Sequence, residues 1–225
     1  MKLAKNYIDV GLFSNRREEQ LAFWQQTVGL PFDHIGKLGG GVQQHRHHMN
    51  GSILKINHTR DPLPAAPASA ILELRIARSG LPAAQSLVDP DGNRVMLVPP
   101  GADGVVGICV VRKVSDLMAS DDFYVNAMGC LREREGVWRC GDTLLIAGER
   151  GPVANIGELR ASGFRYLTVQ VWDCIAEHAG VLARGGTEGR PPTVLGDTVR
   201  YSFVIDPDGT FIEISQRASL TGGHI

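Results

Sequence analysis

Features that would assign a functional class at once are scarce in this chain of 225 residues. Its formal net charge of -1 excludes the basic surface on which nucleic-acid binding and attraction to anionic lipids depend. No apolar run approaches the roughly 18 residues of a membrane span, and residues 1–6 lack the apolar segment of a signal peptide. We therefore expect a cytoplasmic protein that binds neither nucleic acid nor membrane.

Cysteine is scarce as well. The four cysteines lack the paired spacing of a zinc site and are too few for a disulfide scaffold; they are Cys109, Cys130, Cys140 and Cys174. Reduced thiols agree with the expected location. The hydrophobic content of 43% and the charged content of 21% are typical of a globular protein with an apolar core.

Two sequence patterns occur twice in the chain. Residues 23–30 contain Phe-Trp and then Val-Gly-Leu, and residues 123–130, 100 positions later, contain Phe-Tyr and then Met-Gly-Cys. Asp-Pro-Asp-Gly at 89–92 returns at 206–209, 117 positions later. Self-similarity of this kind indicates one supersecondary unit that is used more than once.

The hydrophobic periodicity predicts four such units. The first has a strand over 7–13, a helix over 16–28 ended by Gly29, and a hairpin of strands 42–48 and 52–57 around Asn50-Gly51. The second unit is abbreviated and has strands 71–77 and 94–98. The third unit has a strand over 108–114 and a helix over 117–128. The fourth unit has a strand over 166–172, a helix over 174–183 and two strands over 198–205 and 211–216.

A Pro-Pro-Gly linker at 99–104 divides these units into two halves. We expect an N-terminal half at 1–100, a C-terminal half at 105–217 and a tail at 218–225.

The order of elements, the Phe-aromatic pair at a helix end and Asp-Pro-Asp-Gly before a final strand resemble the vicinal oxygen chelate superfamily. That superfamily includes glyoxalase I, methylmalonyl-CoA epimerase, extradiol dioxygenases and bleomycin-resistance proteins. The resemblance covers residues 5 to 217. It implies an α+β fold of four βαβββ-type units, arranged as two paired-module halves whose curled mixed sheets form cups around a small-molecule site.

The resemblance also implies one divalent metal (Fe, Mn, Ni or Zn) in a working cup. Its usual ligands are a His on the first strand of each unit and a Glu on the strand after Asp-Pro-Asp-Gly. The matching positions here are Asp9, Ile71 and Met96 in the first half and Cys109, Tyr166 and Glu213 in the second. Only Glu213 agrees with the pattern, so the metal site is either atypical or absent.

Extradiol ring cleavage is not expected. The dioxygenases of the superfamily place a catalytic Tyr and a His before the metal-binding Glu, and this chain has Phe203 and Val194 there.

Strand alternation predicts which other side chains enter the cups. If consecutive units share a cup, the first receives Asp9, Lys55, Glu73 and Arg75, and the second receives Cys109, Lys113, Tyr166, Gln170, Tyr201 and Glu213. Buried ionisable groups need partners. We therefore expect Asp9–Lys55 or Glu73–Arg75 ion pairs in place of a metal.

His45 and His47 lie in the segment Gln-Gln-His-Arg-His-His and share one face of a strand, about 7 Å apart. Together with Glu213 they are candidate ligands of an improvised metal site. They are also candidates for an acid–base pair, for ligand contacts, or for a polar edge strand that faces solvent.

Glu213 is the strongest catalytic candidate, as a general base with Tyr166 and Tyr201 as hydrogen-bond donors. The alternative for Glu213 is a structural pair with Arg200. Cys109 is a weaker candidate, because a cysteine in an apolar strand is usually part of the core. The expected ligand-binding residues are Asp9, His45, His47, Lys55, Cys109 and Phe203.

Two functions follow from these residues. The first is a glyoxalase- or dioxygenase-like enzyme (lyase, isomerase or oxygenase) that acts on a small aromatic or oxo compound with an atypical or absent metal. The alternative is a metal-free small-molecule-binding protein of the bleomycin-resistance type. The ionisable residues favour the enzyme, which we predict, and the missing metal ligands favour the binding protein. A homodimer is compatible with the resemblance.

Overall fold

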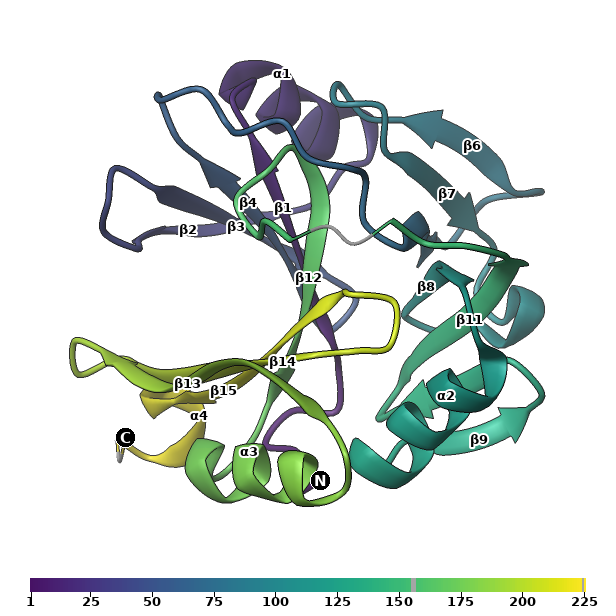
Figure 1. Cartoon of the computed structure of the whole chain (residues 1–225). Coiled ribbons are helices and arrows are strands. Elements are labelled where there is room, and N and C mark those ends of the chain that lie inside the picture. Colours follow the sequence, from purple (N-terminus) through teal and green to yellow (C-terminus); the bar gives the residue numbers. More distant parts are fainter. Residues whose placement is uncertain (155–156, 224) are drawn as a thin grey trace.

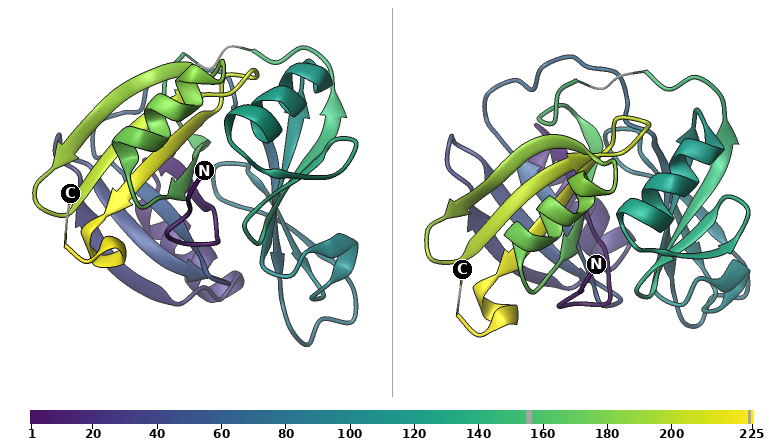
Figure 2. Two further views of the ribbon diagram at one scale, coloured as in Figure 1. Left: turned by 90° about the horizontal axis from the view of Figure 1, so that it is seen from below. Right: turned by 60° about the horizontal axis from the view of Figure 1, so that its bottom comes forward.

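The computed structural model describes residues 1–154, 157–223 and 225, and they form two mixed β-sheets with short helices (Figures 1 and 2). The first sheet has the strand order β13-β14-β15-β12-β1-β4-β3-β2, and the second has the order β6-β7-β5-β8-β11-β10-β9. The α+β fold with curled mixed sheets built from four units is confirmed. His224, in the expected tail, lies outside the described residues.

The first sheet consists of β1 (Asp9–Ser14), β2 (Phe32–Lys37), β3 (Gln43–Met49), β4 (Ser52–His58), β12 (Gly163–Gln170), β13 (Thr187–Leu195), β14 (Val199–Ile205) and β15 (Phe211–Arg217). The second consists of β5 (Ile71–Ala77), β6 (Gln85–Val88), β7 (Arg94–Val98), β8 (Ile108–Val114), β9 (Leu131–Arg134), β10 (Val137–Cys140) and β11 (Thr143–Arg150). The helices are α1 (Arg17–Ala22), η1 (Phe23–Thr27), η2 (Ala102–Gly104), α2 (Leu117–Asp121), η3 (Asp122–Ala127), α3 (Cys174–Ala183) and α4 (Ala218–Thr221). Within the described ranges, no helix is long and apolar enough to cross a membrane.

The units pair differently from the expectation that consecutive units share a cup. Antiparallel pairing of β1 with β12 joins the first unit to the fourth, and antiparallel pairing of β5 with β8 joins the second unit to the third. That expectation was therefore wrong. Each sheet draws strands from both sides of the linker, and the cup of the first sheet combines residues from the two ends of the chain.

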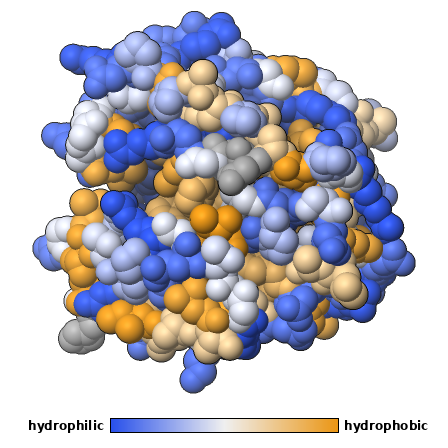
Figure 3. All heavy atoms as spheres, in the orientation of Figure 1, coloured by the Kyte–Doolittle hydropathy of each residue, from blue (hydrophilic) through white to orange (hydrophobic). Residues whose placement is uncertain are grey.

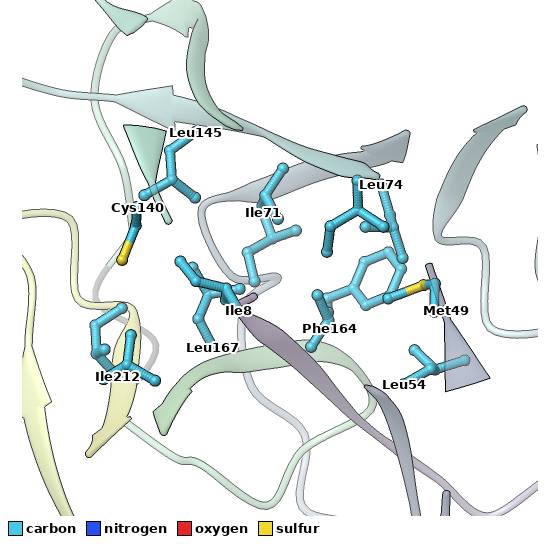
Figure 4. Packing of buried hydrophobic residues seen from close by; sticks show 14 of the residues in the cluster. Ile8, Met49, Leu54, Ile71, Leu74, Cys140, Leu145, Phe164, Leu167 and Ile212 are labelled. Atoms are coloured by element: carbon cyan, nitrogen blue, oxygen red, sulfur yellow. The ribbon is translucent and has the colours of Figure 1, made fainter. Parts of the chain in front are cut away.

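The apolar core lies between the sheets. Leu54, Leu167 and Ile212 of the first sheet point toward Leu74 and Leu145 of the second (Figure 4). Because side chains alternate along a strand, the intervening residues of the first sheet point away from this core. Several of them line the cavity between the two arms of that sheet, β2–β4 and β13–β15. Figure 1 shows how the two arms are arranged.

The repeated aromatic segments have the same local structure. Each begins as an α-helix, α1 or α2, and continues as a π-helical turn, η1 or η3. The rings of Phe23 and Trp24 lie 5.1 Å apart at 87°, and those of Phe123 and Tyr124 lie 5.1 Å apart at 88°. A glycine with positive φ, Gly29 or Gly129, follows each helix.

The first Asp-Pro-Asp-Gly turn binds the helix of another unit. One carboxylate oxygen of Asp89 accepts hydrogen bonds from the backbone of Asp91 (2.9 Å) and Asn93 (2.8 Å), which closes the turn. The other accepts a bond from Gln20 Nε2 (3.1 Å), and Gln20 Oε1 accepts one from the Trp24 indole (2.7 Å). We call Gln20, Trp24 and Asp89 the first clamp.

The second turn makes an equivalent contact with a helix, and this contact also includes an ion pair. Asp206 Oδ1 accepts bonds from the backbone of Asp208 (3.0 Å) and Thr210 (2.8 Å). Its Oδ2 accepts a bond from the Tyr124 hydroxyl (2.6 Å) and forms an ion pair with the buried Arg112. We call Arg112, Tyr124 and Asp206 the second clamp. Each clamp joins a turn of one sheet to a helix that belongs to the other.

The two clamps differ in charge, which allows a matched test. We expect Asp206→Asn to lower the free energy of unfolding by about 3 to 5 kcal/mol, because it leaves the buried Arg112 without its carboxylate. Asp89→Asn, which faces a neutral Gln20, should cost about 1 to 3 kcal/mol. Urea denaturation of both variants measures the difference, and the reverse order would contradict this account of the second clamp.

Candidate functional site

The cup of the first sheet holds a cavity of about 120 Å³. The space-filling surface is hollowed between the two arms of the sheet (Figure 3). At roughly 10 to 15 Å³ for each water molecule, this volume accommodates several waters or a small ring. Its floor is polar (Gln44, Lys55, Asn57, Tyr166, Glu213), and its walls combine aromatic side chains (Phe13, Tyr201, Phe203) with aliphatic ones (Leu38, Val42, Leu159, Leu195, Val199). Three arginines complete the lining (Arg160, Arg190, Arg217).

A buried ammonium group lies at the centre of the floor. Lys55 is 1% exposed, and its Nζ donates to Glu213 Oε2 and to Thr168 Oγ1, both at 2.7 Å. Thr168 in turn donates to the same Glu213 oxygen at 2.7 Å. Burial lowers the pKa of Lys55, and the negative charges of Glu213 and Asp9 oppose that shift.

Asp9 is buried beside this pair but has its own cation. Its carboxylate lies 2.5 Å from Lys5 Nζ and accepts hydrogen bonds from the Ile53 amide (2.8 Å) and Gln170 (3.2 Å). The expected Asp9–Lys55 pair is therefore replaced by two pairs, Asp9–Lys5 and Lys55–Glu213.

The strand register changes one of the positions that the resemblance matched to metal ligands, because Thr168 rather than Tyr166 lies in line with Glu213. Asp9 lies opposite Thr168, and Thr168 lies opposite Glu213, so these three residues form one row across β1, β12 and β15. Tyr166 is paired with Gly11 and Phe211 instead. A glycine is required at position 11, because a Cβ atom there would lie about 2.0 Å from the Tyr166 ring.

The residues of the cup do not fit a divalent metal. In the row that runs from Asp9 to Glu213, the Lys55 ammonium already supplies a positive charge and occupies Glu213 Oε2. An ammonium group has no lone pair to donate and would repel a cation. Among the residues that the structure describes, no three His, Cys, Asp or Glu side chains gather as a metal site.

His45 and His47 do not meet Glu213. Both are buried on the opposite face of β3 from Gln44, on the side of the α1–η1 helix, where His47 Nε2 lies 3.0 Å from Gln25 Nε2. The proposed set of Glu213, His45 and His47 is therefore not assembled. The alternative of a solvent-facing edge strand does not hold either, because β2, which the periodicity did not reveal, covers β3.

Tyr166, Tyr201 and Phe203 are brought together with Glu213. The Tyr166 hydroxyl oxygen accepts bonds from Asn57 (3.1 Å) and Gln44 (3.4 Å). Burial, followed by the charge of Glu213, raises the pKa of Tyr166, so its phenol stays protonated. The Phe203 ring lies 6.1 Å from the Tyr166 ring and 6.0 Å from the Tyr201 ring, and the Tyr201 hydroxyl accepts a bond from Arg190 (3.2 Å).

Cys109 lies in the second sheet, away from Glu213. It is fully buried in an apolar cluster with Val98 and Leu144, and burial raises the pKa of its thiol to about 12. A thiol held neutral in this way is a core residue rather than a nucleophile. The expected Glu73–Arg75 pair forms in the same sheet at 2.8 Å.

Comparison with solved structures finds the same architecture over nearly the whole chain. Glyoxalase I from Zea mays covers 99% of this chain and 96% of its own, with 14% identity and a TM-score of 0.72. A candidate dioxygenase from Bacillus subtilis subsp. subtilis str. 168 covers 96% and 85%, with 11% identity and a TM-score of 0.65. The cppA protein from Streptococcus pneumoniae TIGR4 covers 96% and 100%, with 9% identity and a TM-score of 0.57.

The chain has the vicinal oxygen chelate fold. No protein-family model matches the sequence, and no curated protein sequence matches it. At these identities the structural likeness establishes the vicinal oxygen chelate fold and leaves the activity to be argued from the cup itself.

Several residues of the cup were missed by sequence reasoning. Thr168 lies two positions after Tyr166 on β12, so strict alternation would have placed it on the same face. The same rule applied from Lys55 reaches Asn57, and from Glu213 it reaches Arg217. Arg190, on the edge strand β13, had no comparable signal, because register shifts interrupt its pairing with β14.

The Lys55–Glu213 pair can be measured by a double-mutant cycle. We expect Lys55→Met and Glu213→Gln each to lower the free energy of unfolding by about 3 to 5 kcal/mol, because each leaves one buried charge unpaired. The double variant should lose less than the sum of the two. The exposed pair Glu135–Arg150 is the control, and the same cycle there should give about 0 to 1 kcal/mol. Additive losses at Lys55 and Glu213 would contradict the pairing.

The burial of His47 predicts a pH dependence of stability. Burial, followed by the charge of His45, lowers the pKa of His47 to about 4 from 6.5. Between these values the unfolded chain binds the proton and the folded chain does not, so stability falls as the pH drops from 6.5 to 4. One proton corresponds to a slope on the order of 1.4 kcal/mol per pH unit.

Denaturant titrations at several pH values would test this. The slope in that window should be smaller in His47→Gln than in the unsubstituted protein, and parallel profiles would count against a neutral, buried His47.

Proposed function

We propose that this protein binds a small molecule without a metal, in the cup of the first sheet, in the manner of the bleomycin-resistance type. The observation that carries the proposal is the Lys55–Glu213 pair on the floor of the cup. The lysine supplies the positive charge at this point from within the chain, so the carboxylate is satisfied without a dication.

The remaining surface of the cup suits ligand binding. The floor is rigid, because Gln44, Asn57 and Tyr166 hydrogen-bond to one another. The walls are apolar, with both aromatic and aliphatic side chains. A concave site with apolar walls and a few fixed polar groups is the usual form of a small-molecule site.

A catalytic role of Glu213 is the second candidate, and one observation favours it. Both hydrogen bonds to Glu213 end on Oε2, and Oε1 has no hydrogen-bond partner among the described residues. Since the side chain lines the cavity and is 13% exposed, Oε1 is available to accept a proton from a bound molecule. The Tyr166 phenol would then be the nearby donor. This candidate also requires no metal.

Metal analysis together with ligand screening tests the proposal. Protein expressed in medium supplemented with Fe, Mn, Ni and Zn should contain only substoichiometric metal, and a chelator should leave its thermal midpoint unchanged. Fragment screening by ligand-observed NMR in the presence of the chelator should give hits. A stoichiometric metal that is lost in Glu213→Gln would overturn metal-free binding.

Two neighbouring residues on β13 provide matched variants for the screen. Leu195 lines the cavity, whereas Val194 is 48% exposed and does not. We expect Leu195→Trp to abolish the hits by filling the cup and Val194→Trp to leave them unchanged. Conversion of a hit over time, lost in Glu213→Gln, would instead support the catalytic candidate.

A further inference from the structure

The cup carries more positive than negative charge. Lys55, Arg160, Arg190 and Arg217 line the cavity, and Glu213 is the single acidic residue of the lining. Lys55 and Glu213 neutralise each other at 2.7 Å. Within the described part of the chain, the three arginines form no ion pair with a carboxylate, so their charges are uncompensated by the protein.

Arg217 lies close enough to a second arginine, Arg46, to be affected by its positive charge. Arg217 extends from β15, and the buried Arg46 extends from β3 in the other arm of the sheet. The Nε atoms of both are buried and have no hydrogen-bond partner among the described residues. Arg46 donates to Gln44 Oε1 (2.9 Å), and its nearest carboxylate, Asp33, lies 3.7 Å away.

The charges of these two arginines act against each other. Burial, followed by the positive charge of Arg46, lowers the pKa of Arg217, while Glu213, Asp9 and Asp33 act in the opposite direction. The buried Ser215 hydroxyl, two residues from both Glu213 and Arg217 on the same strand, also lacks a hydrogen-bond partner within the described structure. An arginine without a carboxylate partner, with a second arginine and a free hydroxyl nearby, is an arrangement that suits an oxyanion.

The rest of the cavity suits a flat ring. The rings of Phe13 and Tyr166 lie 6.3 Å apart, and Phe203 contacts both Tyr166 (6.1 Å) and Tyr201 (6.0 Å), each at 82°. Such tilted and edge-to-face contacts present both faces and edges of aromatic rings to a ligand. A cavity of about 120 Å³ has room for a substituted ring.

The length of the site agrees with such a ligand. Glu213 and Arg217 are four residues apart on β15, so their Cα atoms lie about 13 Å apart at the usual rise of a strand. A single ring with a polar group at each end can extend between them, with the anionic group at Arg217.

We propose that the cup binds a single-ring aromatic anion, with the ring against Phe13 and Phe203 and the anionic group at Arg217. The proposal rests on the proposed function, because it names the ligand class of the same cup. A carboxylate and a phosphate ester share the required chemistry.

Four probes of similar size and different charge test the ligand class: benzoate, phenyl phosphate, the neutral benzamide and the cationic benzylamine. Isothermal titration of the metal-free full-length protein should show that at least one of the two anions binds about tenfold or more tightly than benzamide, because a charged acceptor strengthens each hydrogen bond from arginine. The comparison of benzoate with phenyl phosphate then distinguishes the two sources of the anionic group.

Arginine variants locate the anionic group. We expect Arg217→Gln to weaken binding of the preferred anion about tenfold or more, because a charge-assisted hydrogen bond is lost. Binding of benzamide should change by less than about twofold. Arg200→Gln on the same hairpin is the control, because Arg200 does not line the cavity. The thermal midpoint of each variant establishes that it is folded. If Arg217→Gln does not fold, the exposed Arg190 provides a second variant. Arg190→Gln should also weaken binding of the anion more than binding of benzamide.

Three results would overturn the ligand class. The first is that benzamide or benzylamine binds as tightly as the anions or more tightly. The second is that Arg217→Gln and Arg200→Gln lose equal affinity for the preferred anion. The third is that none of the four probes binds. Binding of the neutral or cationic probe to the metal-free cup would leave the proposed function intact. A stoichiometric metal in the purified protein would remove the proposed function itself, so the two failures are distinguishable.

Discussion

The arrangement of the two sheets depends on two buried aspartates at the ends of tight turns. Asp89 and Asp206 each satisfy the backbone of their own turn with one oxygen and bind a helix of the other sheet's unit with the second. A carboxylate can do both because its two oxygens accept bonds in different directions. The repeated motif is therefore the joint between the sheets, and the intervening core packs in the space that these joints define.

The charged centre of the cup floor is supplied by the chain itself. The cation beside Thr168 and Glu213 is the ammonium of Lys55, which donates a hydrogen bond to each of them. A lysine side chain is covalently attached, so its charge cannot be removed by a chelator or exchanged for another ion. Lys55 and Glu213 balance each other, and the other charged residues of the cavity lining are arginines.

Local patterns predicted more of the molecule than long-range ones. The repeat and the strand alternation identified both turns and placed Lys55, Tyr166, Tyr201 and Glu213 in cups, because these features depend only on residues close in sequence. The pairing of β1 with β12 was missed, since nothing local specifies which distant strand completes a sheet. The same gap explains why His45 and His47 were linked to a carboxylate on the opposite face. Thr168 was within reach of the local rule, since it lies two positions after Tyr166 on β12.

The strands of the second sheet are consecutive in the chain, whereas those of the first sheet come from its two ends. This order has a consequence for folding. All strands of the second sheet lie between β4 and β12 in the chain, so that sheet is complete once residue 150 has emerged during synthesis. The cup, in contrast, joins Lys55 to a residue 158 positions later. Such distant contacts close slowly. The edge of β1 therefore stays open until β12 is available, and the cavity between the two arms is completed only when β15 has formed.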